Sequence, residues 1–272
     1  MRKYFAGPDS IARWILLLAL WGTRVSAEPV SSTTTPAYDY AIPKLLTGTL
    51  YAIGSHRKDV LYMFRRTATR SGSIVHVKRE FLMPNGTVAA VEKVLYESNQ
   101  LVSFEMQDFQ ARVSGAIHIG PDPEDPARRD IFISYAHGLN PPLGRARLLQ
   151  PDTVIDDTLY PFMVDHWNAL MEGEAVKFHF VSLNWERTFE FELVKTGESV
   201  QDGLPVVQLT MRPTSFFISA LVKPILFSVQ TSAPHRVLSY IGRTTPRILK
   251  GKSWKDLDAE TVFNYQATDG HG

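Results

Sequence analysis

Cysteine is absent from this chain of 272 residues. Its absence excludes disulfide bonds, thiolate metal sites, a cysteine nucleophile and a lipid-modified N-terminal cysteine. An exported chain without disulfides depends on its hydrophobic core for stability. At this length a core alone suffices, because the share of surface buried on folding grows with chain size.

Motifs of the common enzyme and cofactor classes are also missing. The sequence holds no Gly-x-Ser-x-Gly elbow, no His-Glu-x-x-His, no dinucleotide-type glycine fingerprint and no calcium loop. Gly251-Lys252-Ser253 ends like a phosphate-binding loop, but Pro246 stands where its first glycine is needed. The eight histidines are not spaced as metal ligands. We therefore predict no catalytic motif, no metal and no cofactor.

The sequence also has no large excess of positive or negative charge, since the formal net charge is +1. Without residues 1–27, which hold four basic and one acidic residue, 25 basic residues face 27 acidic ones. This balance argues against nucleic-acid binding, which needs a concentrated basic surface. A local basic excess either meets an anionic head group or forms the solvated face of neighbouring strands. It comprises Arg57, Lys58, Arg65, Arg66, Arg70, Lys78 and Arg79.

One long apolar run is present, near the N-terminus, over residues 14–21. Basic residues precede it, and Val25-Ser26-Ala27 supplies small residues for cleavage. This pattern predicts a secretory signal peptide over residues 1–27, with a retained N-terminal anchor as the alternative. The run is shorter than the roughly 20 residues of a spanning helix. We expect a soluble mature chain without a spanning segment, in the periplasm or secreted, and the lack of disulfides favours the periplasm.

The remaining chain is organised as a leader and one β domain. Residues 28–43 are rich in Ser, Thr and Pro and predict a flexible leader. From residue 44 to 268, β-type runs recur with turn signals between them, which is typical of an antiparallel meander. Proline-rich patches place a seam between two halves, if there is one, near residues 120–155. The runs are 45–53, 60–67, 74–83, 88–96, 101–109, 111–119, 131–135, 206–212, 225–230, 236–243 and 260–266.

Two alternating segments, 175–181 and 188–193, predict a hairpin. A register that sets Phe178 opposite Phe191 keeps the apolar side chains together on one face. The same register sets His179 opposite Glu190 on the polar face. The fold class that we predict is therefore mainly β: a large curved antiparallel sheet, an open or half barrel, with one or two short helices packed on it.

A short helix is predicted over residues 160–173, with Pro161 in its first turn and Gly173 at a left-handed C-cap. Its apolar face includes Phe162 and Trp167 and should pack on the sheet. His166 lies on the same face. As a general base it would need a partner from elsewhere in the fold, and a histidine bonded to a backbone carbonyl is the favoured interpretation.

The stretch from Phe216 to Val222 is apolar on every side. A sheet curved around an apolar cavity needs a lid, and binding pockets are lined mainly by apolar and aromatic groups. A plain core segment is the alternative. The residues that we nominate as apolar lining or lid are Phe216, Phe217, Ile218, Leu221, Phe162 and Trp167.

A resemblance to a known family rests on the order of the predicted elements and on two short runs. The runs are residues 173–178 (Gly-Glu-Ala-Val-Lys-Phe) and 236–242 (Arg-Val-Leu-Ser-Tyr-Ile-Gly). The chain resembles a family of uncharacterised periplasmic antiparallel β-sheet proteins. More distantly it is similar to the half-barrel lipoprotein carriers of the bacterial envelope. Those carriers hold acyl chains in the concavity of an open curved sheet. The likeness spans roughly residues 44–268 and transfers no functional residue.

Three hypotheses for the function follow. The first is an exported, non-catalytic envelope protein that binds or shields an apolar, lipid-like ligand in its curved sheet. The second is an envelope scaffold or protein-interaction module with a filled core. The third is an enzyme with a spatially assembled site around His166. A lipid or other apolar small molecule, or an envelope protein, is the expected partner.

Overall fold

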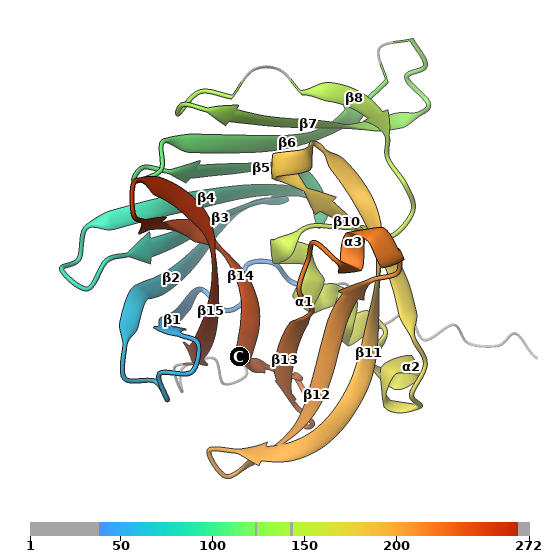
Figure 1. Cartoon of the computed structure of the whole chain (residues 1–272). Helices are drawn as coiled ribbons and strands as arrows, with labels where there is room; N and C mark the ends of the chain where they lie inside the picture. Colours follow the sequence, from blue (N-terminus) through green and yellow to red (C-terminus); the bar gives the residue numbers. More distant parts are fainter. Residues whose placement is uncertain (1–37, 123, 142–143, 266–272) are drawn as a thin grey trace, which may run out of the picture. The chain divides into compact units, whose positions relative to one another are not determined.

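The computed structural model describes residues 38–265, apart from residues 123 and 142–143. Within this part, fifteen strands form one sheet in the order β8-β7-β6-β5-β4-β3-β2-β1-β15-β14-β13-β12-β11-β10-β9 (Figure 1). Neighbouring strands are antiparallel except β9 and β10, which are parallel. The mainly β fold class with a large, open, mostly antiparallel sheet is confirmed. The predicted signal peptide, residues 28–37 of the leader and residues 266–268 lie outside the described residues.

The strands are β1 (Leu45–Ala52), β2 (Val60–Ser71), β3 (Ile74–Leu82), β4 (Val88–Glu97), β5 (Gln100–Asp108), β6 (Val113–Pro121), β7 (Arg129–His137), β8 (Arg145–Leu148), β9 (Thr153–Val154), β10 (Val176–Ser182), β11 (Arg187–Gln201), β12 (Leu204–Pro213), β13 (Ile225–Gln230), β14 (Val237–Lys250) and β15 (Ser253–Asn264). The helices are α1 (Asp156–Asp165), α2 (Trp167–Met171), α3 (Phe216–Ser219) and the 3-10 turn η1 (Leu183–Trp185).

The sheet consists of two meanders, β1 to β8 and β9 to β15, that are joined by the pairing of β1 with β15. Sequence neighbours pair from β1 to β8 and from β9 to β15, and β1 pairs with β15. The strands β8 and β9 form the two edges, yet only residues 149–152 separate them in the chain. Since Leu148 and Thr153 are five residues apart, the two edges can be at most about 18 Å apart there. The sheet therefore curls until its edges come near each other, without closing into a barrel.

Helix α1 lies inside this curl (Figure 1). Its residues Leu159, Phe162 and Met163 belong to a core cluster with β10 to β14. Its first turn faces the other limb of the sheet, where Tyr96 of β4 donates a hydrogen bond of 2.7 Å to Asp157. A helix with contacts to both limbs holds them apart, which leaves room for a pocket beside it.

The helical segment differs from the prediction in its bounds. Helix α1 begins at Asp156, where the Oγ1 of Thr158 accepts the N–H of Ile155 at 2.9 Å. Pro161 consequently lies inside the helix and not in its first turn. The helix ends before His166, and α2 continues the chain. Gly173 has φ of 87° and donates its N–H to the carbonyl of Leu170, as the C-cap prediction requires.

The predicted hairpin of β10 and β11 is confirmed residue by residue. Phe178 pairs with Phe191, Phe180 with Phe189 and His179 with Glu190. The tip of this hairpin reaches the far limb of the sheet, where Glu186 accepts the backbone N–H of Tyr135 in β7 at 3.0 Å. The hairpin tip therefore contributes to the curl of the sheet.

Residues 38–43, which the sequence assigns to the flexible leader, pack on the sheet. The ring of Tyr40 stacks on Tyr96 with centroids 3.7 Å apart, and Ala41 is buried. Arg66 of β2 donates hydrogen bonds of 2.7 Å to the carbonyls of Tyr40 and Pro43. The residues that hold this segment in place are distant in sequence. The composition of the segment alone therefore does not indicate that it packs on the sheet.

Candidate functional site

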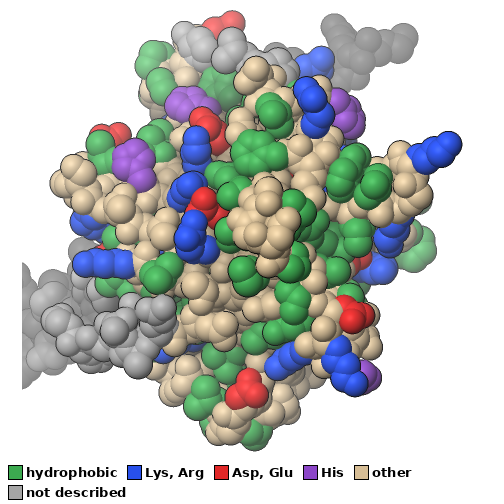
Figure 2. Space-filling model, turned by 90° about the vertical axis from the view of Figure 1, so that its left-hand side faces the viewer, with side chains coloured by type: hydrophobic (Ala, Val, Ile, Leu, Met, Phe, Trp, Pro, Cys, Tyr) green, Lys and Arg blue, Asp and Glu red, His purple; other side chains and the backbone are tan. Residues whose placement is uncertain are grey.

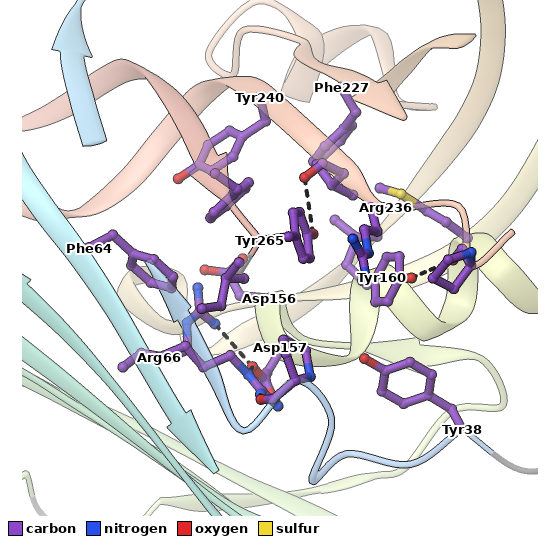
Figure 3. Close-up of a pocket in the computed structure, with 18 of the residues that line it drawn as sticks. Tyr38, Phe64, Arg66, Asp156, Asp157, Tyr160, Phe227, Arg236, Tyr240 and Tyr265 are labelled. Atoms are coloured by element: carbon purple, nitrogen blue, oxygen red, sulfur yellow. Dashed lines mark hydrogen bonds and ion pairs between the residues drawn. The ribbon is translucent and has the colours of Figure 1, made fainter. Parts of the chain in front are cut away.

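A pocket lies between α1, the segment 38–43 and strands β1, β2, β3 and β13 to β15 (Figure 3). Its volume is about 260 Å³. We call it the central pocket. Most of its wall is apolar, and the apolar residues that line it from the helix and the strands include Leu46, Phe64, Leu159, Met163, Phe227 and Phe263.

Four tyrosines also line the central pocket: Tyr38, Tyr160, Tyr240 and Tyr265. The hydroxyl of Tyr160 donates to the carbonyl of Pro234 at 2.6 Å, and that of Tyr265 donates to the carbonyl of Val237 at 3.1 Å. Burial raises the pKa of Tyr160 to about 12. These hydroxyls therefore stay neutral at physiological pH, and the rings present apolar faces to the pocket.

One side of the pocket is polar. We call this side the polar cluster; it consists of Arg66 and Arg79, the lining carboxylates Asp156 and Asp157, and Glu92 behind them. Figure 3 shows Arg66, Asp156 and Asp157 grouped across from Tyr240 and Phe227. A polar group opposite an apolar wall is the arrangement that orients an amphiphilic molecule.

Asp157 is the best-satisfied carboxylate of the polar cluster. It accepts the hydroxyl of Tyr96, and its Oδ1 lies 3.7 Å from Nε of Arg66 and 3.8 Å from Nη1 of Arg79. The side chains of Asp157 and Arg66 are only 7% and 8% exposed. Burial raises the pKa of Tyr96, and the adjacent Asp157 raises it further, so Tyr96 remains a donor.

Arg79 and Glu92 form an ion pair deeper in the polar cluster. Nε of Arg79 lies 2.9 Å from Oε2 of Glu92, although the N–H does not point along a hydrogen-bond direction. Thr245 of β14 donates to the other carboxylate oxygen of Glu92. Burial raises the pKa of Glu92 to about 7, although Arg79 opposes the shift. At neutral pH, protonated and ionised Glu92 are therefore close in free energy.

Asp156 occupies an unusual place within the polar cluster. It begins α1 in the interior, where burial raises its pKa against the opposing effect of Arg79. The residue is nonetheless accessible to solvent, and it lines the central pocket. Among the described residues no side chain hydrogen-bonds to it or forms an ion pair with it within 4 Å. Its carboxylate therefore remains available to a molecule in the pocket.

The six residues nominated from the sequence are not among those that line the central pocket. Phe162 packs on Phe178 inside the core, with ring centroids 4.9 Å apart. Trp167 stacks on His235 at 3.9 Å. In and beside α3, Phe216, Phe217 and Leu221 are strongly exposed, and Ile218 is half-buried. Contact of these six residues with a ligand stays a prediction.

His166 is bonded to a backbone carbonyl, as the favoured interpretation of the sequence predicts. Its Nδ1 lies 3.0 Å from the carbonyl oxygen of Phe162, and its ring stands beside the ring of Phe162. Within residues 38–265, no group of three or more His, Asp or Glu side chains is placed to hold a metal ion. No helix of this part is long and apolar enough to cross a bilayer.

The basic excess of the sequence divides between the two faces of the sheet. Arg65 and Lys78 point outward and both pair with Glu80, at 2.7 and 2.8 Å. Arg66 and Arg79 point inward to the polar cluster, a placement that the solvated-face interpretation missed. On the face shown in Figure 2, Lys and Arg side chains are interspersed with apolar and acidic ones.

Asp156, Asp157 and Arg79 were not recognised as site residues from the sequence. A weak signal existed, since two adjacent carboxylates preceded an apolar helix face and a pair of strands carried excess arginine. Adjacent acids at a helix N-terminus are ordinarily explained by the helix dipole. Only the curl of the sheet brings them opposite the arginines.

Comparisons with known proteins assign no family to the chain. No family model matches the chain, and no curated protein matches it. Among solved structures, the chain is similar to a crystal structure of a beta-barrel-like protein of domain of unknown function DUF1849 from Brucella abortus. The match covers 80% of this chain and 92% of that chain, with 8% identity and a TM-score of 0.36.

Proposed function

We propose that this protein is an exported, non-catalytic protein of the bacterial envelope that binds an apolar, lipid-like ligand in the central pocket. The observation that supports the proposal is the pocket itself, which has a volume of about 260 Å³ and walls that are mainly apolar and aromatic. Interiors of proteins are otherwise closely packed, with few voids larger than a water molecule. A pocket of this size beside an internal helix favours a ligand.

The course of the pocket along β14 favours a chain-like ligand. Val237, Tyr240 and Arg243 of this strand all line it. Six residues of extended strand span about 20 Å, so the lining extends over that length. A modest volume drawn out over such a length suits an acyl or alkyl chain better than a compact ring system.

Export rests on the N-terminal pattern of the sequence. Basic residues, an apolar run at 14–21 and small residues before position 28 are typical of a signal peptide. A lipid-like ligand fits a location between membranes, because an apolar molecule crosses an aqueous compartment only when it is shielded from water.

The second candidate function is a protein-interaction module, and the exposed apolar side chains around α3 favour it. Phe216, Phe217 and Leu221 are 83%, 80% and 67% exposed. Exposed apolar groups that cluster on a surface mark interaction sites more often than single ones do. This candidate does not require an occupied pocket, which separates it from the first.

Native mass spectrometry of the protein, purified without detergent from cells that express the full chain, tests the proposal. We expect a co-purifying small molecule that denaturing extraction identifies as lipid-like. Val237→Trp, which places a larger side chain at the pocket wall, should abolish the added mass. Leu226→Trp, on the neighbouring strand and 43% exposed, is the matched control and should retain it. A wild-type protein with no added mass that also fails to bind an apolar dye refutes the proposal.

A further inference from the structure

The polar cluster does not balance its own charges. It holds three carboxylates, Glu92, Asp156 and Asp157, against two guanidinium groups, Arg66 and Arg79. Both arginines are already committed: Arg66 to two backbone carbonyls and Asp157, and Arg79 to Glu92 and Asp157. With every group ionised, one negative charge remains. Of these three carboxylates, Asp156 alone has no hydrogen-bond or ion-pair partner among the described residues.

Two other polar atoms of the cluster are also left without hydrogen bonds. Nη1 of Arg79 and Oε2 of Glu92 are buried and have no hydrogen-bond partner. The side chain of Glu92 is only 1% exposed. Buried polar atoms are normally paired, and unpaired ones call for an explanation such as a function or a missing ligand. A cation bound at Asp156 would offset the excess negative charge beside Glu92, whose Oε2 has only its ion pair with Arg79 at 2.9 Å. Nη1 of Arg79 is a donor, and its nearest carboxylate oxygen is Oδ1 of Asp157 at 3.8 Å.

The competing recognition group is Arg236, at another position along the pocket. It lines the pocket without a carboxylate within 4 Å among the described residues, so it could bind an anionic head group. Its guanidinium, however, lies over the ring of Tyr265 at 4.9 Å from the centroid. Stacking on an aromatic face is an arrangement in which arginine is stable without a carboxylate. Asp156 has no comparable partner.

We propose that Asp156 binds a positively charged amino group of the ligand, so that the central pocket selects apolar molecules with a cationic nitrogen over those with a carboxylate. The inference deepens the proposed function and rests on it. The apolar part of such a ligand lies against the aromatic wall, and the amino group donates hydrogen bonds to the free carboxylate.

The affinity for an amine should depend on the protonation of the carboxyls in the polar cluster. The charged and titratable groups that face Asp156 are Arg79 of β3, Glu92 of β4, Asp157 of α1 and Tyr240 of β14. Burial raises the pKa of both Asp156 and Glu92, and a bound cation favours their ionised forms. An alkylamine stays charged up to about pH 10. Its affinity should therefore rise with pH as these carboxyls ionise, through about pH 7 where Glu92 titrates, whereas the affinity of an uncharged alcohol should not.

Three probes with the same alkyl chain test the proposal: decylamine, decanol and decanoate. Each is titrated against the full chain loaded with N-phenyl-1-naphthylamine, a neutral apolar dye whose fluorescence falls on displacement. We expect decylamine to bind at least about tenfold more tightly than decanoate, as one charge-assisted hydrogen bond allows. Asp156→Asn should remove this preference. Asp165→Asn, an exposed acid at the other end of α1, is the matched control and should keep it.

The possible results separate this inference from the proposed function. Dye binding with displacement by all three probes alike, or a preference that survives in Asp156→Asn, overturns the role of Asp156 and leaves an apolar pocket standing. The reverse order, with decanoate tightest and its advantage lost in Arg236→Gln, assigns the head group to Arg236 and overturns the inference. A chain that binds neither dye nor probe contradicts both. Thermal unfolding of each variant verifies that it is folded.

Discussion

Replacing Arg79 by Met tests whether the polar cluster is held together by buried charge. The substitution retains an unbranched apolar stem and removes the guanidinium. Arg79 lies 2.9 Å from Glu92 and 3.8 Å from Asp157, and its side chain is 14% exposed. Burial lowers its pKa, but Glu92 and Asp157 outweigh that effect and raise the pKa, so Arg79 is charged. The variant leaves Glu92, which is 1% exposed, without an adjacent cation.

The expected cost follows from the burial of the pair. Removing one partner of a buried ion pair destabilises a protein by about 3–5 kcal/mol, because the other charge stays buried and uncompensated. Here Arg66 still lies 3.7 Å from Asp157, and Glu92 can take up a proton, so we expect the lower end, about 3 kcal/mol. Arg212→Met is the control. Arg212 pairs with Glu192 at 2.7 Å but is 53% exposed, and exposed pairs contribute less than about 1 kcal/mol.

The loss of stability in Arg79→Met should depend on pH, and the titration of Glu92 determines whether it grows or shrinks as pH rises. Its pKa is raised from 4.5 to about 7 in the folded protein. A carboxyl with a raised folded pKa contributes stability that is complete below the unfolded pKa and is lost as pH rises through the folded pKa. The wild type should therefore lose stability between about pH 4.5 and pH 7. Without Arg79 the pKa of Glu92 rises further, so the penalty is larger at about pH 8 than at about pH 5.

Urea unfolding monitored by the fluorescence of the tryptophans measures both effects. The free energy of unfolding is compared for wild type, Arg79→Met and Arg212→Met at the two pH values, with the slope against urea checked for constancy. A penalty for Arg79→Met below about 1 kcal/mol at the higher pH refutes the buried-pair argument. An equal penalty at both pH values refutes the role of Glu92.

Two further substitutions test contacts around the pocket. Tyr96→Phe removes the 2.7 Å hydrogen bond to the buried Asp157 and should cost about 1.5–3 kcal/mol in urea unfolding; an unchanged midpoint shows that water replaces the hydroxyl. Gly242→Ala places a Cβ 2.8 Å from two side-chain carbons of Ile225 and should cost about 1–3 kcal/mol by overpacking. Because Ile225→Ala removes those carbons, the double variant should cost less than the two single variants together, and strict additivity contradicts the contact.

Local patterns in the sequence were sufficient to predict most of the strands. The alternation in residues 175–181 and 188–193 predicted the register of β10 with β11, because one slip would turn every phenylalanine to water. Gly173 marked the end of the helical segment, because a left-handed backbone there favours glycine. These features depend on neighbours a few residues apart, so the sequence by itself determined them.

The edges of the sheet were harder to predict from sequence. Strand β8 is exposed throughout and β9 has two residues, so neither carries a hydrophobic alternation. The strands β14 and β15 run on past the predicted ends at residue 243 and before residue 260. Their shared hairpin is interrupted by a register shift between Thr244 and Ile248, which breaks the period of two that sequence patterns rely on.

The central pocket was decided by tertiary structure alone. Adjacent Arg65 and Arg66 must point to opposite faces of β2, but the sequence does not say which face is the interior. Only the pairing of β1 with β15 and the curl of the sheet around α1 turn Arg66 inward. For the same reason Asp156 lies near enough to Arg79, 77 residues away in the chain, for the guanidinium to act on its pKa. Sequence periodicity encodes which residues share a face, whereas long-range pairing decides which faces meet.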